Sequence, residues 1–365
     1  MAVARTIPIE PAENAIRTLP VPQTGDVTRE GGFWRDRLGR PLHDLRISVT
    51  DHCNFRCRYC MPKEVFTSRH RFLAMTELLT FEEIERLAAI AVRNGVVKLR
   101  LTGGEPLLRR GIETLVERLA ALRTPSGDPI DIAMTTNGSI LAKKARALAE
   151  AGLKRVTVSL DAIDEDIFQG FNDVGFPAAK VLAGIDTALA EGFQVKVNTV
   201  VKRGVNEAET VRIAEHFRGT GVIPRFIEYM DVGTSNGWRM TEVVPSRETL
   251  DRIAERWAVD PIDPNYPGET ASRWRYRDGA GEFGLISSVT RAFLPRLLAR
   301  APVDGRPSLS LSLRNGGVRH PHDVARAGAP TKNSKKRSGA SGPFVATATR
   351  SCAPSALRLR ETRSR

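Results

Sequence analysis

Three of the four cysteines of this chain lie in one short stretch, Asp51-His52-Cys53-Asn54-Phe55-Arg56-Cys57-Arg58-Tyr59-Cys60. Thiolates that are so close in sequence can bind one metal centre together. A structural zinc ion takes four ligands and would lack one here. An iron–sulfur cube held by three cysteines instead keeps one iron open for a small molecule. We therefore predict a [4Fe-4S] cluster at Cys53, Cys57 and Cys60; the alternative is a group of buried or redox-active cysteines.

Strand-like and helix-like segments alternate regularly from Leu45 onward. Short β-branched segments at 45–50, 96–101, 130–135, 155–160, 195–201 and 223–229 alternate with amphipathic segments at 81–94, 110–122, 140–151, 178–191 and 207–218. Thr80 and Glu83 form a capping-box pattern at the start of the first of these helices. Six strand–helix units predict a parallel sheet with right-handed crossovers. Six units cannot close an eightfold barrel, so we expect an α/β fold, a partial (β/α)6 TIM-type barrel; a doubly wound sheet is the alternative.

Ligands bind at the carboxyl ends of the strands in both of these architectures. Polar or glycine-bearing residues mark that end of every predicted strand. They are the cysteine loop, Thr102-Gly103-Gly104-Glu105-Pro106, Thr135-Thr136-Asn137-Gly138, Ser159-Leu160-Asp161, Lys196-Val197-Asn198-Thr199 and Glu228-Tyr229-Met230. We therefore expect one site that all six strands line.

Cationic side chains interrupt strands that are otherwise apolar. Arg46, Arg100 and Lys196 are the main examples, and Lys98 and Arg225 are further candidates. A buried cation is costly unless it is paired. Several cations that converge on one cavity therefore predict an anionic substrate such as a polyphosphate, which arginine binds in a bidentate manner. The alternative is that each cation pairs with a carboxylate inside the barrel, for instance Arg225 with Glu228.

Two features of the loops indicate a small-molecule ligand beside the cysteines. Gly103 and Gly104 lack Cβ, so the backbone can approach a ligand there, and its carbonyl groups suit the amino group of an amino acid. The alternative is that the two glycines only form a turn. Tyr59 could stack on an adenine or form a hydrogen bond with it; the alternative is a packing role within the loop.

The basic character of the chain is confined to its last part. The chain has 55 Lys and Arg against 42 Asp and Glu, a net charge of +13. Residues 294–365 contain 15 of these basic and 3 of these acidic residues, a net charge of +12, so the remaining 40 basic and 39 acidic residues nearly balance. This segment has few aromatic side chains to stack on bases, and we predict no nucleic-acid partner.

The same composition predicts three regions. Residues 1–40 form a flexible N-terminal extension, residues 41–293 form the barrel core, and residues 294–365 form a basic low-complexity tail. Sparse, clustered cysteines indicate a reducing compartment. No run of about eighteen apolar residues and no signal-peptide pattern occur, so we expect a cytoplasmic protein without a membrane partner.

The motifs of residues 40–293 together resemble those of a known superfamily. Cys-x-x-x-Cys-x-Tyr-Cys at 53–60, Leu-Thr-Gly-Gly-Glu-Pro at 101–106, Thr-Thr-Asn-Gly at 135–138 and Val-Ser-Leu-Asp at 158–161 resemble the radical S-adenosylmethionine superfamily. Leu-Arg-Ile-Ser-Val-Thr at 45–50, Lys-Val-Asn-Thr-Val at 196–200 and Arg-Phe-Ile-Glu-Tyr-Met at 225–230 resemble its GTP 3′,8-cyclase family in particular. That family catalyses the first step of molybdenum-cofactor biosynthesis.

The resemblance implies a function for the matching positions. Cys53, Cys57 and Cys60 would bind the [4Fe-4S] cluster; Tyr59, Gly104, Ser159 and Met230 would line the S-adenosylmethionine site; Arg46, Arg100, Thr135 and Lys196 would contact GTP. Reductive cleavage of the sulfonium would give a 5′-deoxyadenosyl radical, which takes the ribose 3′ hydrogen of GTP. The sugar radical would then attack C8 of guanine, giving 3′,8-cyclo-7,8-dihydro-GTP, a lyase reaction.

The resemblance also implies partners. An electron donor such as flavodoxin or ferredoxin would supply the electron for the reaction, and cyclic pyranopterin synthase would take its product. The chain would form a homodimer in one possible assembly. Two other functions remain open. One is a radical enzyme that acts on another substrate such as a peptide, and the other is a non-catalytic binding module with a nucleic-acid-binding tail.

The chain departs from the family pattern immediately after Phe293. Relatives have three cysteines there for a second iron–sulfur cluster, which anchors the guanine; this chain has Leu294, Leu297 and Leu311. We predict a reading-frame shift as the cause. One extra C before the codons TGC CGC GAC TGC TCG CGC changes Cys-Arg-Asp-Cys-Ser-Arg to Leu-Pro-Arg-Leu-Leu-Ala, which is the sequence from Leu294 to Ala299. We therefore expect an aberrant tail without a stable core and an impaired activity; the alternative is an evolved basic tail.

Overall fold

The computed structural model describes residues 28–30, 33–35, 41–231, 237–266, 269–290 and 308–311 of the chain. The predicted N-terminal extension therefore lies almost entirely outside the described residues. The same holds for the predicted tail, of which only the four residues Ser308–Leu311 are described, as a strand. We did not expect a strand there.

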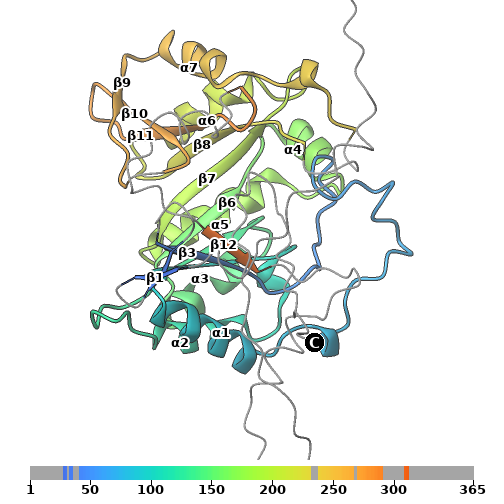
Figure 1. Cartoon of the computed structure of the whole chain (residues 1–365). Helices are drawn as coiled ribbons and strands as arrows, with labels where there is room; N and C mark the ends of the chain where they lie inside the picture. Colours follow the sequence, from blue (N-terminus) through green and yellow to red (C-terminus); the bar gives the residue numbers. More distant parts are fainter. Residues whose placement is uncertain are drawn as a thin grey trace, which may run out of the picture.

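Six parallel strands in sequence order form the centre of one large sheet (Figure 1). They are β3 (Asp44–Ser48), β4 (Lys98–Thr102), β5 (Asp131–Thr136), β6 (Arg155–Ser159), β7 (Gln194–Val201) and β8 (Ile223–Glu228). β11 (Glu282–Ile286) adds in parallel to β8, and β10 (Ser272–Tyr276) and β9 (Val259–Ile262) follow in antiparallel fashion. β12 (Ser308–Leu311) lies parallel to β3 at the opposite edge. A separate hairpin pairs β1 (Thr28–Glu30) with β2 (Phe33–Arg35).

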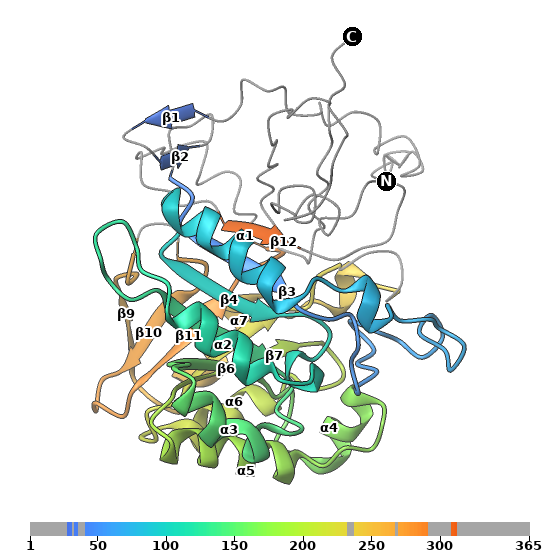
Figure 2. The ribbon, with the colours of Figure 1, turned by 90° about the horizontal axis from the view of Figure 1, so that it is seen from below.

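Helices connect the strands and follow one another along the outside of the sheet (Figure 2). They are α1 (Phe81–Arg93), α2 (Ile112–Ala120), α3 (Leu141–Glu150), α4 (Glu165–Asn172), α5 (Ala178–Ala190), α6 (Glu209–Phe217) and α7 (Ser246–Ala254), with short 3-10 turns η2 (Met75–Glu77), η3 (Pro106–Leu108) and η4 (Met240–Glu242). A doubly wound sheet reverses its strand order at one point, and this sheet does not from β3 to β8. The partial (β/α)6 barrel is therefore confirmed, and the doubly wound alternative is wrong.

The first helix begins where the sequence predicts. The Thr80 side chain accepts a hydrogen bond from the Glu83 N–H at 3.2 Å, and the Glu83 carboxylate accepts one from the Thr80 N–H at 2.9 Å. This reciprocal pair satisfies two N–H groups that the first turn of a helix leaves without an acceptor.

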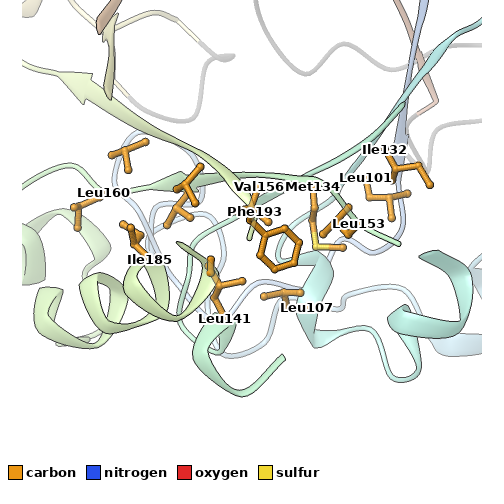
Figure 3. Close-up of a cluster of buried hydrophobic side chains, with 14 of the residues drawn as sticks. Leu101, Leu107, Ile132, Met134, Leu141, Leu153, Val156, Leu160, Ile185 and Phe193 are labelled. Carbon is orange, nitrogen blue, oxygen red and sulfur yellow. The ribbon is translucent and has the colours of Figure 1, made fainter. Parts of the chain in front are cut away.

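Alternation along the strands separates an apolar outer face from a polar inner face. Successive side chains of a strand point to opposite faces. Leu99 and Leu101 of β4 and Val156 and Val158 of β6 are buried against the helices. Figure 3 shows part of this layer, in which Met134 of β5 and Val156 lie near Leu141 of α3 and Phe193. The residues between them, such as Arg100, face the inside of the barrel.

The sequence did not predict every element. The six central strands and five helices are confirmed within a few residues at their ends. α4, α7 and the strands β1, β2 and β9 to β12 were not predicted. α4 has only eight residues, too few for helical periodicity to show clearly in the sequence, and β9 has only four.

Candidate active site

The cysteine loop follows β3 and is held against α4. The N–H groups of Arg56 and Arg58 donate to the carbonyl oxygens of Asn172 and Phe171 at 2.9 and 3.3 Å. The Phe55 ring is buried among the rings of Phe168 and Phe176. The helix that the sequence analysis missed therefore fixes the position of the cysteines.

The three cysteines are free thiols on this one loop. Cys53 and Cys57 are partly buried and Cys60 is exposed. The N–H groups of Cys60 and Met61 both donate to the Cys57 carbonyl, at 2.9 and 2.8 Å, which makes a tight turn between the second and third cysteines. Burial raises the pKa of the Cys53 and Cys57 thiols, so metal binding rather than the protein must drive their deprotonation.

Within the described ranges, no three His, Cys, Asp or Glu side chains surround one point as the ligands of a single ion would. In a [4Fe-4S] cube each thiolate binds a different iron, and three cysteines are enough to hold it. Three free thiols on one loop, two of them partly buried, fit such a group. They do not fit a structural zinc site, which needs four ligands.

The Gly-Gly turn after β4 packs directly on the cysteine loop. A Cβ on Gly104 would lie 2.2 Å from the His52 carbonyl oxygen, and one on Gly103 would lie 2.4 Å from that of Thr50. Only glycine permits this approach. The close contact that the structure reveals is with the backbone of the chain itself.

Glu105 joins this turn to the next strand. The side chain is fully buried and accepts hydrogen bonds from the Thr136 hydroxyl at 2.7 Å and from the N–H groups of Asn137 and Leu107 at 2.6 and 3.0 Å. Burial raises the pKa of Glu105 to about 7. The sequence alone did not predict a function for Glu105. A carboxylate between a double glycine and Pro106 is the feature that could have indicated one.

Tyr59 extends from the cysteine loop to the end of β6. Its hydroxyl donates to Asp161 Oδ2 at 3.1 Å, and the N–H of Val200 donates to Asp161 Oδ1 at 2.9 Å. Burial raises the pKa of the Asp161 carboxyl to about 7. Asp161 was part of a predicted motif, but its contact with Tyr59 was not predicted.

Two other candidate residues lie at the same edge. Ser159 ends β6 and pairs in register with Asn198 of β7. The Asn198 Oδ1 atom is buried and has no hydrogen-bond donor in the described part of the chain. Met230 follows β8 and is partly buried. The carboxyl ends of β6, β7 and β8 thus bring these side chains to one edge of the sheet.

The inner face of the barrel carries the predicted cations. Arg46 and Arg100 are in register on β3 and β4, and Thr135 is in register with Thr157, which in turn is in register with Lys196. Arg100 Nη1 donates to Thr135 Oγ1 at 3.1 Å and to Thr157 Oγ1 at 3.3 Å. The four residues predicted to contact an anion therefore share one face of the sheet.

The electrostatics of this face favour an anion. Burial, and then the charge of Arg225, lowers the pKa of Arg100 to about 9 and that of Lys196 to about 8. Burial also lowers the pKa of Arg225 to about 10. The cations thus lie close enough to disfavour one another's charge, and a bound anion would relieve this.

Some cations of the barrel do have carboxylate partners. Lys98 lies 3.8 Å from Asp44, and Arg155 forms an ion pair with Asp131. In contrast, the described residues contain no ion pair of Arg46, Arg100, Lys196 or Arg225. The suggested pair between Arg225 and Glu228 is wrong, because the two side chains point to opposite faces of β8. Glu228 instead accepts hydrogen bonds from residues Ser246, Val289 and Thr290.

Comparison with known proteins identifies the family. Residues 47–217 match the model of the Radical SAM superfamily, and residues 222–294 match that of Molybdenum Cofactor Synthesis C. The chain is 56% identical to the GTP 3′,8-cyclase of Acidothermus cellulolyticus over 260 residues, 71% of either protein. It is 47% identical to that of Staphylococcus epidermidis over 274 residues, 74% of this chain and 79% of the relative. The chain belongs to the GTP 3′,8-cyclase family.

Membership in the GTP 3′,8-cyclase family, and so in the Radical SAM superfamily, implies a [4Fe-4S] cluster and S-adenosylmethionine as cofactors. Among solved structures, Streptococcus suis SuiB bound to S-adenosylmethionine is similar, with a TM-score of 0.48 and 17% identity over 59% of this chain and 46% of SuiB. None of the helices in the described ranges combines the length and the apolar character needed to cross a membrane.

Proposed function

We propose that this chain binds GTP on the inner face of the barrel and converts it to 3′,8-cyclo-7,8-dihydro-GTP, the first step of molybdenum-cofactor biosynthesis. One observation carries the proposal. Arg46, Arg100, Lys196 and Arg225 converge on the inner face, below the edge where the cysteine loop lies, and none of them forms an ion pair within the described residues. A radical enzyme that acts on a neutral peptide has no need of such a cationic surface.

Four residues at the carboxyl edge would hold S-adenosylmethionine beside the cluster. Tyr59 extends from the cysteine loop, Gly104 lies on the Gly-Gly turn, Ser159 ends β6 and Met230 follows β8. The contact between Tyr59 and Asp161 supports this arrangement because it fixes the tyrosine ring between the loop and the sheet.

Four residues of the inner face would bind GTP. Arg46, Arg100 and Lys196 would contact the triphosphate by charge-assisted hydrogen bonds. Thr135 accepts a hydrogen bond from Arg100 and would orient this guanidinium group. With the phosphates held at this depth, the ribose would face the edge where S-adenosylmethionine binds.

Cys53, Cys57 and Cys60 would hold the [4Fe-4S] cluster, which supplies the electron that cleaves the sulfonium. The protein's own contribution is positional. The inner face would fix the substrate by its charge, and the cysteine loop, which follows β3 and packs on α4, would fix the cysteines relative to it. The buried carboxyl groups of Glu105 and Asp161 join neighbouring strand ends by hydrogen bonds with Thr136 and Val200.

The domain boundaries follow from the same proposal. Residues 41–293 would be the catalytic core, preceded by a flexible extension over 1–40. The tail over 294–365 would replace the region that holds the second cluster in the family. The match to Molybdenum Cofactor Synthesis C ends at residue 294, and Leu294, Leu297 and Leu311 stand where the cysteines are expected. This supports a chain that assembles one cluster and cyclises little GTP.

The partners of such an enzyme would be an electron donor of the flavodoxin or ferredoxin class and cyclic pyranopterin synthase, which takes the product. A homodimer is part of the same proposal. The reducing cytoplasm suits a cluster held by thiolates, and we propose that location.

Anaerobic reconstitution tests the function directly. The chain is loaded with iron and sulfide, supplied with dithionite and S-adenosylmethionine, and assayed for 5′-deoxyadenosine with and without GTP. We expect GTP to bind and to increase deoxyadenosine formation, with little cyclised product. Deoxyadenosine formation without any binding of GTP would instead indicate a different substrate. The absence of both would indicate a binding module.

A further inference from the structure

Thr157 occupies the centre of the inner face. It lies on β6 with 3% of its surface exposed, and its neighbours in register are Thr135 on β5 and Lys196 on β7. Both of these neighbours are among the residues proposed to contact GTP. Neither the motifs of the sequence nor the composition of the strand singled out Thr157.

The Thr157 hydroxyl is shared by two cations. Its Oγ1 atom accepts a hydrogen bond from Arg100 Nη1 at 3.3 Å and one from Arg225 Nη2 at 3.4 Å. Arg100 is on β4 and Arg225 is on β8, so the two guanidinium groups reach this oxygen from opposite sides of β6. One neutral side chain thereby connects the two halves of the cationic surface.

A hydroxyl suits this position better than a carboxylate. Arg100 and Arg225 repel each other, and neither forms an ion pair within the described residues. A carboxylate would hold them together but would neutralise the charge that attracts an anion. A hydroxyl oxygen accepts both N–H groups and leaves the charge in place, so the cations are oriented before the ligand arrives.

We infer that Thr157 is a positioning residue for the polyphosphate of the substrate. It holds Arg100 and Arg225 in a converging arrangement. Its own O–H, which remains a donor once both lone pairs accept, is available to an oxygen of the bound anion. This inference rests on the proposed function, since it concerns the same substrate site.

The test compares dissociation constants for GTP and for inorganic tripolyphosphate, measured by calorimetry on the anaerobically reconstituted full chain. Thr157→Val keeps the shape of the side chain and removes the hydroxyl. We expect it to raise the dissociation constants of both ligands about tenfold, which corresponds to the loss of roughly one charge-assisted hydrogen bond. Thr157→Ser keeps the hydroxyl and should bind close to wild type. Thr210→Val is the matched control, because Thr210 is equally buried but lies on α6. S-adenosylmethionine should bind equally well to all variants.

A second pair of variants keeps the test informative if Thr157→Val does not fold. Thr157→Ser and Thr157→Ala both lack the methyl group and differ only in the hydroxyl, so a difference in tripolyphosphate affinity between them supports the inference. Equal affinities in this pair, or wild-type affinity in Thr157→Val, would overturn it. A wild type that binds tripolyphosphate but not GTP would refute the proposed function and leave the tripolyphosphate comparison valid. A wild type that binds neither would overturn both.

Discussion

The N–H of Gly104 donates a hydrogen bond to the carbonyl oxygen of Thr50 at 2.7 Å. The next amide, that of Glu105, donates to His52 at the same distance. The turn after β4 and the start of the cysteine loop are thus joined by backbone hydrogen bonds, and a Cβ at Gly104 would lie 2.2 Å from the His52 oxygen. The position of the first cysteine, Cys53, therefore depends on Gly104, which lies 51 residues further along the chain.

Gly104→Ala should prevent this contact. The clash is with backbone atoms, which cannot move aside as a flexible side chain can, so the cysteine loop must shift away from the sheet. We expect the variant to bind substantially less iron and sulfide on reconstitution. The control is Gly170→Ala on α4, where a Cβ meets nothing within 4 Å. Equal cluster content in the two variants would show that the contact does not control cluster assembly.

Cys57→Ala tests the cluster itself. It removes one of three predicted thiolate ligands, and a cube with two protein ligands should not persist. The brown absorbance of the reconstituted protein and the formation of 5′-deoxyadenosine should both be lost. Cys352→Ala, at the fourth cysteine of the chain, is the matched control and should retain both. Full absorbance in Cys57→Ala would contradict the assignment.

The cations of the inner face should act on GTP alone. Arg46→Ala, Arg100→Ala and Lys196→Ala should each weaken GTP binding by about 1.5–3 kcal/mol, the usual contribution of a charge-assisted hydrogen bond. S-adenosylmethionine should bind as before, and Arg146→Ala on the exposed face of α3 should affect neither ligand. Calorimetric titration with each ligand measures the two affinities in each variant and in the wild type. A parallel loss of both ligands would mean that these residues support the fold instead.

The low pKa of Lys196 predicts a pH dependence of binding. Burial, and then the charge of Arg225, lowers this pKa from 10.5 to about 8. Only the protonated amine attracts a phosphate, so tripolyphosphate affinity should fall as the pH rises through 8, and binding near pH 8 should take up protons. The stability of the fold should respond to pH in the opposite direction. The unfolded chain holds this proton up to pH 10.5, whereas the folded chain loses it near pH 8. The lysine's contribution to the free energy of unfolding therefore rises between pH 8 and 10.5.

Lys196→Arg is the matched variant for this effect, because the ordinary pKa of arginine, 12.5, lies above that of lysine, 10.5, so an arginine at that position keeps more of its charge over the same range. Its affinity for tripolyphosphate should change less between about pH 7 and about pH 9 than that of the wild type. Lys98, whose pKa is also lowered to about 8 by burial, should account for part of the remaining change. An identical pH profile in the two proteins would exclude Lys196 as the titrating group.

The sequence predicted the strands of the barrel well, because strands that are buried against helices must alternate apolar and inward-facing residues. The same alternation makes Arg46, Arg100 and Lys196 visible as inward-facing cations. It also shows why pairing Arg225 with Glu228 was wrong: residues an odd number of positions apart in a strand point to opposite faces. The spacing of three positions between Arg225 and Glu228 was therefore sufficient to exclude this pair.

Contacts between distant segments could not be predicted in this way. The hydrogen bonds of Thr157 with Arg100 and Arg225 join strands whose register the sequence does not specify. The packing of the cysteine loop on α4 depends on a helix of only eight residues, too short to give a clear period. The aligned polar edge was predictable, whereas the hydrogen bonds within it required the three-dimensional arrangement.

The last prediction concerns the reading frame after Phe293. The balance of charge, the cysteine pattern and the match to the family all change at this point of the sequence, which indicates a single event. Removing one nucleotide near codon 294 should restore three cysteines, and the repaired protein should bind about twice the iron per chain, as expected for two cubes in place of one. It should also convert GTP to the cyclised product, whereas the chain as it stands should make little. Full cyclase activity in the present chain would contradict this prediction, as would a gene whose shifted frame encodes no such cysteines.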